Sequence, residues 1–108
     1  MERKKNIDLT TLIKPGLTDS ISGRSFGEEF AKKIKLTELI KENYFVEFFI
    51  DASSVKAIND SFIKGLFSSL FENFDYEKIH KSIKINASDY YQSLFEKNLK
   101  ILQALSNV

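Results

Sequence analysis

The chain has 108 residues, enough for one hydrophobic core but too few for two domains. Hydrophobic residues make up 43% of it and charged residues 29%, the balance of an ordinary soluble globular protein. The net charge of +1 excludes a strong overall attraction to nucleic acid or to an anionic membrane, and no apolar run is long enough to span a bilayer. Polar residues follow the basic start Arg3-Lys4-Lys5, so we expect no export signal. The absence of cysteine excludes disulfides and thiolate chemistry and fits a cytoplasmic protein.

The first predicted element is a strand over Asn6–Ile13, where apolar residues alternate loosely. Lys14-Pro15-Gly16 ends it, because Pro15 lacks a backbone donor and Gly16 tolerates positive φ. Residues Leu17–Arg24 are predicted to form a polar loop.

A helix is expected to start after this loop. Ser25-Phe26-Gly27-Glu28 has the S-x-x-E spacing of a capping box. Apolar residues, beginning with Phe26 and Phe30, then recur at helical spacing. The apolar stripe shifts further on, so we expect the helix to bend or restart near Thr37 and to end by Asn43.

Tyr44–Ile50 is the clearest predicted strand, with β-forming residues on both alternating faces. Two apolar faces predict a central strand with helices covering both sides of the sheet. Glu47 is the exception, and we expect it where the covering is incomplete.

Asp60–Phe74 has the strongest helical periodicity, and Asn59 or Asp60 is expected to cap the helix. A polar connection over Asp75–Lys81 and a short strand over Ile83–Ala87 follow. Ser88 is expected to cap a last helix, whose apolar stripe includes Asn98.

Strands separated by helices indicate right-handed crossovers, and so an α/β fold with a mainly parallel or mixed sheet of about three to four strands and helices packed on it. We expect a single domain over residues 1–108, with an N-terminal strand and loop in residues 1–22 and the core in residues 23–105.

Two segments resemble those of known domains. The segment FVEFFIDASSVKAINDSF, residues 45–62, resembles the signature of STAS domains, found in sulfate transporters and anti-sigma factor antagonists. That signature is a hydrophobic strand ending in Asp, a short turn, and a helix opened by D-S-S or S-S-F. Gly23-Arg24-Ser25-Phe26-Gly27 resembles the G-R-x-x-G segment before the first helix of a bacterial STAS-like family of unknown function. The similarity in element order covers residues 23–105.

The resemblance implies a protein-binding role. In anti-sigma factor antagonists, the start of the helix after the central strand contacts a histidine-kinase-like ATPase, and phosphorylation of a serine there breaks the complex by changing charge and fit. If Ser61 matches the second serine of D-S-S, Asp60 occupies the phosphorylated position; we favour this alignment. If the register shifts by one residue, Ser61 is the phospho-acceptor. The implied partner-binding residues are Asp51, Ser53, Asn59, Asp60, Ser61 and Lys64.

These residues also have structural explanations. Asn59, Asp60 and Ser61 are good capping residues, and Asp51 suits a turn. Arg24 and Ser25 stand at a predicted helix start, where exposed amides favour an anion, but we prefer to interpret Arg24 as an ordinary surface arginine.

Nothing in the pattern indicates catalysis or a cofactor. His80 is the only histidine and has no second histidine or cysteine to share a metal. Our leading hypothesis, which the resemblance implies, is a non-catalytic regulatory module that binds a protein such as a histidine-kinase-like ATPase. A second hypothesis is an anion or nucleotide sensor that uses Arg24 and Ser25. A third is a structural oligomerisation unit such as a homodimer, since ten phenylalanines are many for so small a core.

Overall fold

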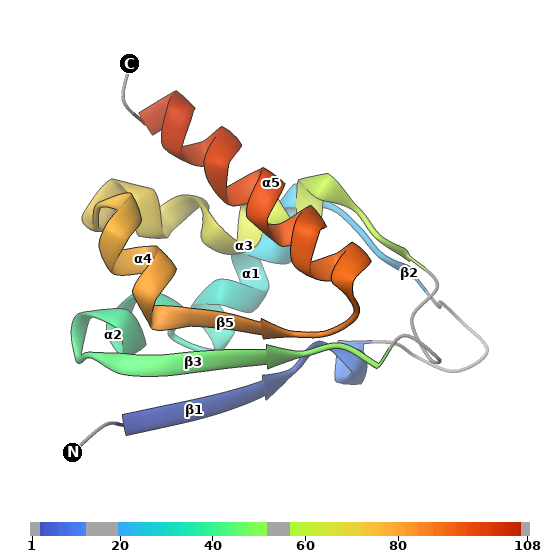
Figure 1. Ribbon diagram of the computed structural model, residues 1–108, viewed down its shortest axis with the longest axis horizontal. Helices are drawn as coiled ribbons and strands as arrows, with labels where there is room; N and C mark the ends of the chain where they lie inside the picture. The colour runs from blue at the N-terminus through green and yellow to red at the C-terminus, as the bar shows by residue number, and fades with distance from the viewer. Residues whose placement is uncertain (1–2, 13–19, 52–56, 107–108) are drawn as a thin grey trace.

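The computed structural model describes residues 3–12, 20–51 and 57–106, and these form an α/β structure, as expected (Figure 1). Three parallel strands form the main sheet, in the order β1-β3-β5. A second, two-stranded parallel sheet pairs β2 with β4. The strands are β1 (Arg3–Asp8), β2 (Ser20–Ile21), β3 (Tyr44–Phe49), β4 (Ala57–Ile58) and β5 (Ile83–Asn86). The predicted strand over Tyr44–Ile50 is thus confirmed as the central one.

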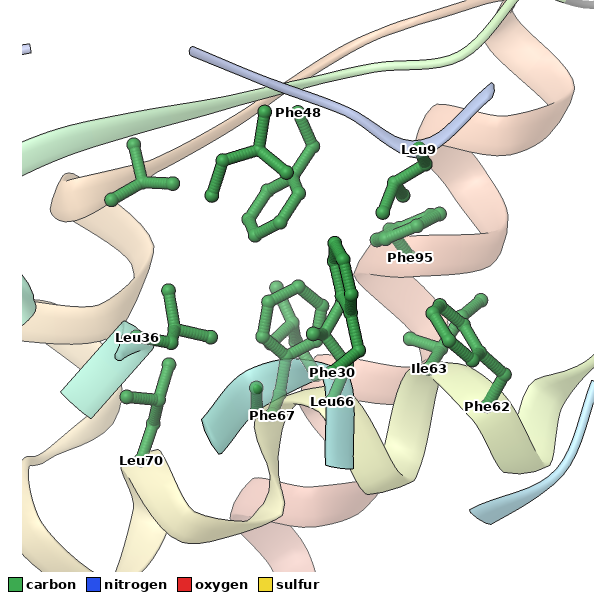
Figure 2. Packing of buried hydrophobic residues seen from close by; sticks show 14 of the residues in the cluster. Leu9, Phe30, Leu36, Phe48, Phe62, Ile63, Leu66, Phe67, Leu70 and Phe95 are labelled. Atoms are coloured by element: carbon green, nitrogen blue, oxygen red, sulfur yellow. The ribbon is translucent and has the colours of Figure 1, made fainter. Parts of the chain in front are cut away.

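Five α-helices and one 3-10 helix accompany these strands. They are η1 (Leu9–Leu12), α1 (Arg24–Lys33), α2 (Leu36–Lys41), α3 (Asp60–Asn73), α4 (Tyr76–Ser82) and α5 (Asp89–Ser106). Buried side chains from all five α-helices join one cluster with Val46 and Phe48 of β3, both completely buried. The ring of Phe67 links Phe48 to Phe95 of α5 through two edge-on contacts, with centroids 5.7 and 5.9 Å apart (Figure 2). One core therefore joins the sheet, α3 and α5.

Two predicted segments differ from the structure near the N-terminus. The first strand covers Arg3–Asp8 and gives way to η1, because the Asp8 carboxylate accepts a hydrogen bond from the Thr10 N–H (2.9 Å) and turns the chain. The predicted loop Leu17–Arg24 contains β2 and the first residue of α1. Ile13, Lys14-Pro15-Gly16 and the first part of that loop lie outside the described residues.

The polar connection expected over Asp75–Lys81 is largely a helix. Asp75 caps α4 by accepting a hydrogen bond from the Lys78 N–H (2.9 Å), and Ile79 is fully buried. The prediction failed because Ile79 is the only buried apolar residue of this short helix, which leaves little hydrophobic periodicity in the sequence.

The predicted capping box at Ser25 is wrong, whereas the predicted helix restart is confirmed. Gly23 is the N-cap of α1 and has no side-chain cap bond, so Ser25 lies inside the first turn. Lys35, with φ 57°, separates α1 from α2 close to the expected break at Thr37. Asn43, with φ 64°, follows α2 and leads into β3, where the second helix was expected to end.

The main sheet is covered by helices on one face, so the prediction of helices on both faces is wrong. Val46 and Phe48 point into the core, whereas Phe45 and Phe49, which alternate with them, are partly exposed and lie outside the core cluster. Their cross-strand neighbours, such as Lys4 of β1 beside Phe45 and Asn86 of β5 beside Phe49, are exposed. Glu47 lies on this face, as expected from the incomplete helical covering, but its surroundings leave it only 4% exposed.

Glu47 is the centre of a polar network on this open face. Its carboxylate lies 2.8 Å from the Lys4 ammonium of β1 and accepts a hydrogen bond from the Asn86 amide of β5 (2.9 Å). The bond from Lys4, followed by that from Asn86, holds the pKa of Glu47 below its ordinary value. The network ties all three strands together on the side that has no helix.

Helices α1 and α3 cross with their main chains in contact. A Cβ atom at Gly65 would lie 2.1 Å from the Arg24 carbonyl oxygen, and one at Gly27 would lie 2.3 Å from the Phe62 carbonyl oxygen. Only glycine leaves room for this approach, which is why two glycines interrupt otherwise regular helices. The crossing fixes the start of α1 beside the start of α3.

We expect Gly65→Ala to lower the free energy of unfolding by about 1–3 kcal/mol, because the new methyl group must push the two backbones apart. Urea denaturation would measure the loss. Glu72→Ala, at an exposed site on the same helix, is the matched control and should change stability by less than about 0.5 kcal/mol. Equal effects of the two substitutions would contradict the tight crossing.

The network of Glu47 predicts a pH dependence. Because the folded-state pKa lies below the unfolded value, the stabilisation is present above the unfolded pKa and is lost as the pH falls through the folded pKa. Glu47→Gln should therefore flatten the fall in unfolding free energy between about pH 5 and pH 3. Urea titrations of both proteins across this range would show it, and parallel curves would argue against the network.

Candidate functional site

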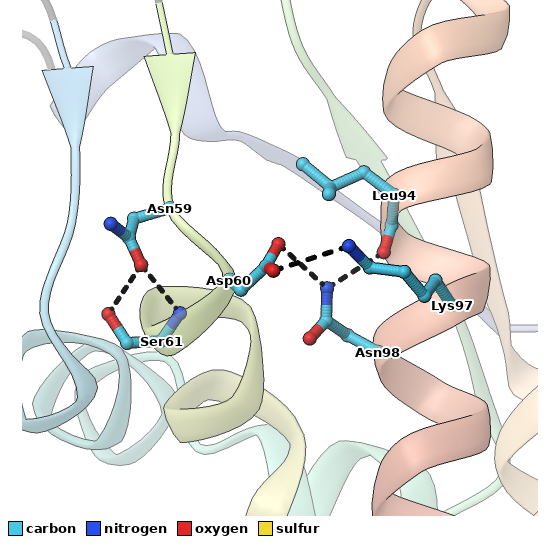
Figure 3. A network of polar contacts seen from close by, with 6 residues as sticks. All are labelled: Asn59, Asp60, Ser61, Leu94, Lys97 and Asn98. Atoms are coloured by element: carbon cyan, nitrogen blue, oxygen red, sulfur yellow. Dashed lines mark hydrogen bonds and ion pairs between the residues drawn. The ribbon is translucent and has the colours of Figure 1, made fainter.

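The start of α3 is an ordered polar tip whose cap is Asn59. The Asn59 Oδ1 atom accepts hydrogen bonds from the Ser61 N–H (2.8 Å) and the Ser61 hydroxyl (2.7 Å) (Figure 3). Capping by Asn59, one of the two predicted residues, is thus confirmed. Asn59 is itself exposed, so the tip is both rigid and accessible.

The hydroxyl of Ser61 joins the tip to α1. Its Oγ atom also accepts a hydrogen bond from the Gly23 N–H (3.3 Å), the residue that opens α1. Ser61 is partly buried, so both of these bonds would break if a phosphate were attached to Oγ. A phosphorylation at this atom would therefore disturb the α1–α3 junction itself.

Asp60 points toward α5 instead of away from the domain (Figure 3). Its carboxylate contacts the Asn98 amide and the Lys97 ammonium, each at 3.3 Å. The hydrogen bond from Asn98, aided by Lys97, keeps the pKa of Asp60 below its ordinary value, so the carboxylate is ionised. The side chain of Asp60 is still 44% exposed, and a partner could therefore reach it.

Asn98 has a role that the sequence pattern did not reveal. It was placed in the apolar stripe of the last helix and is indeed completely buried, yet its amide donates to Asp60 and to the Leu94 carbonyl (2.9 Å). Its own Oδ1 atom has no hydrogen-bond partner in the structure. The sequence did offer one signal for this hydrogen bond, namely a polar amide side chain at a position of the apolar stripe, because buried polar groups need hydrogen-bond partners.

The first turn of α1 completes a continuous surface with this tip. Arg24 and Ser25 are exposed, and the Arg24 Nε lies 3.9 Å from the Glu28 carboxylate. Phe26, expected in the core, is 38% exposed, and its ring lies 5.5 Å from the ring of Phe62. The predicted anion site and the predicted partner site are therefore neighbours, although more than thirty residues separate them in the sequence.

The remaining predicted site residues lie in different environments. Asp51 follows β3, is exposed, and donates its N–H to the Thr10 hydroxyl of η1 (3.0 Å). Lys64 is partly exposed on α3, and its charge contributes to the lowered pKa of Asp60. Ser53 lies outside the described residues.

His80 takes part in a separate cluster at the junction of α4 and α5. Its Nε2 atom lies 3.4 Å from the Glu96 carboxylate, and its ring stacks on Tyr76, whose hydroxyl donates to the same carboxylate (2.8 Å). Burial, followed by the bond to Glu96, raises the pKa of Tyr76. Within the described ranges, no three His, Asp or Glu side chains gather as metal ligands, and no helix has the length and apolarity to cross a membrane.

No protein-family model matches the chain, and searches of curated proteins and of solved structures found no significant match.

We expect Asn59→Ala to lower the free energy of unfolding by about 1 kcal/mol, because the Ser61 N–H loses its cap and the Ser61 hydroxyl loses an acceptor. Asn59→Asp keeps the acceptor and adds a charge that suits a helix start, so it is the matched control and should leave stability nearly unchanged. Thermal unfolding would separate the two variants. A loss with Asn59→Asp as large as that with Asn59→Ala would contradict the capping role.

Proposed function

We propose that the protein is a non-catalytic regulatory module that binds another protein through the adjoining starts of α1 and α3. The observation that carries the proposal is Phe26, which is 38% exposed and packs on Phe62 in the first turn of α3, the helix that Asn59 caps. Exposed aromatic and arginine side chains set among polar residues are typical centres of protein interfaces. Phe26 and Arg24 supply both types here.

Pre-organisation supports this proposal. The tip is held by Asn59, by the Gly23–Ser61 bond and by the ties of Asp60 to α5. A surface that is ordered before binding loses little conformational entropy when a partner arrives. The partly exposed carboxylate of Asp60 adds a fixed negative charge that favours a complementary basic group.

The partner class rests on the resemblance to anti-sigma factor antagonists, which implies a histidine-kinase-like ATPase. In the alignment that we favour, Asp60 supplies a permanent charge where the family is phosphorylated. In the alternative alignment, Ser61 is the phospho-acceptor, and its modification would release the partner by breaking the bonds to Gly23 and Asn59. The geometry favours a protein over a small anion at Arg24, because the Glu28 carboxylate already lies beside the guanidinium.

Binding should depend on Phe26 and Arg24. Tagged wild-type protein is expected to retain a partner from an extract of its source cells, and that partner, made recombinantly, should bind Phe26→Ser and Arg24→Ala at least about tenfold more weakly. Tyr90→Ser is the matched control, because Tyr90 is 69% exposed on α5. Isothermal titration calorimetry would measure the affinities.

Two results would refute the proposal. One is a partner that binds the Phe26→Ser variant as tightly as the wild type while the variant remains folded by circular dichroism. The other is that the Phe26→Ser variant retains every protein that the wild type retains from the extract. Identification of the retained protein as a histidine-kinase-like ATPase would support the partner class.

A further inference from the structure

Strand β5 has an unpaired side at one edge of the main sheet. Among the described strands, it pairs with β3 alone. The Asn86 carbonyl accepts a hydrogen bond from the Ile50 N–H (3.2 Å), so the backbone of Asn86 faces the β3 side. Because successive residues turn their backbone groups to opposite sides, the N–H and C=O groups of Ile83 and Ile85 face away from the sheet. A further strand would bind these four groups.

A groove of about 240 Å³ lies between this edge and α5. Its apolar lining includes Ile85, Phe95 and Leu99, and its polar lining includes Lys84, Gln92 and Glu96. The Gln92 amide donates to the Ala87 carbonyl (2.9 Å), which satisfies the acceptor at the carboxyl end of the edge. Phe95 and Leu99 are buried beneath the groove, whereas Ile83 and Ile85 are partly exposed. The groove thus combines a short backbone ladder with apolar side chains of β5, a combination that binds extended peptides in other folds.

The opposite edge of the sheet differs in a way that protects it. Strand β1 begins with three consecutive basic residues, Arg3, Lys4 and Lys5, all exposed. Lysine-rich edges resist pairing with further strands. Strand β5 carries a single charge, Lys84, between two isoleucines, so it is the more receptive of the two edges.

The charges around the groove favour an acidic occupant. Glu96 is engaged by the Tyr76 hydroxyl and lies beside His80, whereas neither Lys84 nor Lys100 forms a salt bridge within the part of the chain that the structure describes. Lys100 lines an adjoining hollow on α5 that shares Gln92 and Glu96 with the groove. Lys84 stands across from Glu47 in the strand register, on the face without helices, and Lys100 lies on α5, so the two ammonium groups offer positive charge on either side of the β5 edge.

We propose that the groove between β5 and α5 binds an extended acidic segment of a partner protein as a fourth strand of the sheet. Apolar side chains at alternate positions of the segment lie beside the partly exposed Ile83 and Ile85, and carboxylates at the positions between them lie near Lys84. This surface is separate from the α1–α3 surface, so either proposal can fail alone.

The test uses a displayed library of random heptapeptides selected on the full chain. Enriched peptides are expected to alternate apolar and acidic residues, and their synthetic, fluorescently labelled forms should bind in polarisation assays. N-methylation of the two peptide amides that face β5 should weaken binding about tenfold or more, since it removes ladder hydrogen bonds. Bound peptide should shift the amide NMR signals of Ile83 and Ile85.

Charge removal supplies the protein-side comparison. Lys84→Gln should weaken binding of the acidic peptides about threefold without setting a second carboxylate opposite Glu47, whereas Lys33→Gln, at an exposed site on α1, should leave the affinity unchanged. The proposal is overturned if no peptide is enriched, if N-methylated peptides bind equally well, or if the shifted signals cluster at Asn59 and Phe26. A concentration-dependent dimer that Lys84→Gln weakens would overturn it in favour of self-pairing.

Discussion

The main-chain contact between α1 and α3 at Gly27 and Gly65 is the constraint on which the candidate surface depends. With glycine at both positions the two helices approach more closely than any side chain permits. That approach brings the Gly23 N–H within reach of the Ser61 hydroxyl and places the Phe26 ring beside Phe62. If the helices crossed at a greater distance, both of these contacts would be lost. The starts of the two helices would then not form one surface. Stability and proposed recognition therefore share one structural cause.

The second constraint is a parallel sheet with helices on a single face. Such sheets are usually covered on both faces, because their strands are apolar on both. Here the open face is made compatible with water by the ionised Glu47, which joins Lys4 and Asn86 across the three strands. As a consequence, protonation of the Glu47 carboxylate is expected to weaken the sheet. The partly exposed Phe45 and Phe49 complete a face of mixed character.

The polar groups at the start of α3 are largely satisfied inside the domain. Asn59 holds Ser61, and Asp60 binds the side chains of Lys97 and Asn98 on α5. A partner would thus meet a preformed shape in which Phe26 supplies apolar area and the polar groups supply orientation. The groove beside β5 offers a different chemistry, an unpaired backbone edge near two available lysines. Two such surfaces would suit a module that joins more than one partner.

Local periodicity by itself determined the α/β class, the strand Tyr44–Phe49, the long helices α3 and α5, and the break between α1 and α2, because alternation and 3.6-residue spacing record which side of an element is buried. Capping chemistry limited the cap of α3 to Asn59 or Asp60, and the structure selects Asn59. Tertiary structure alone decided that Gly23 and not Ser25 opens α1, that Phe26 is exposed, and that Phe45 and Phe49 face no helix. It also decided that Asn98 reaches Asp60. The reason is physical: a sequence pattern encodes how apolar each face is, whereas the identity of the neighbour on that face depends on how distant segments cross.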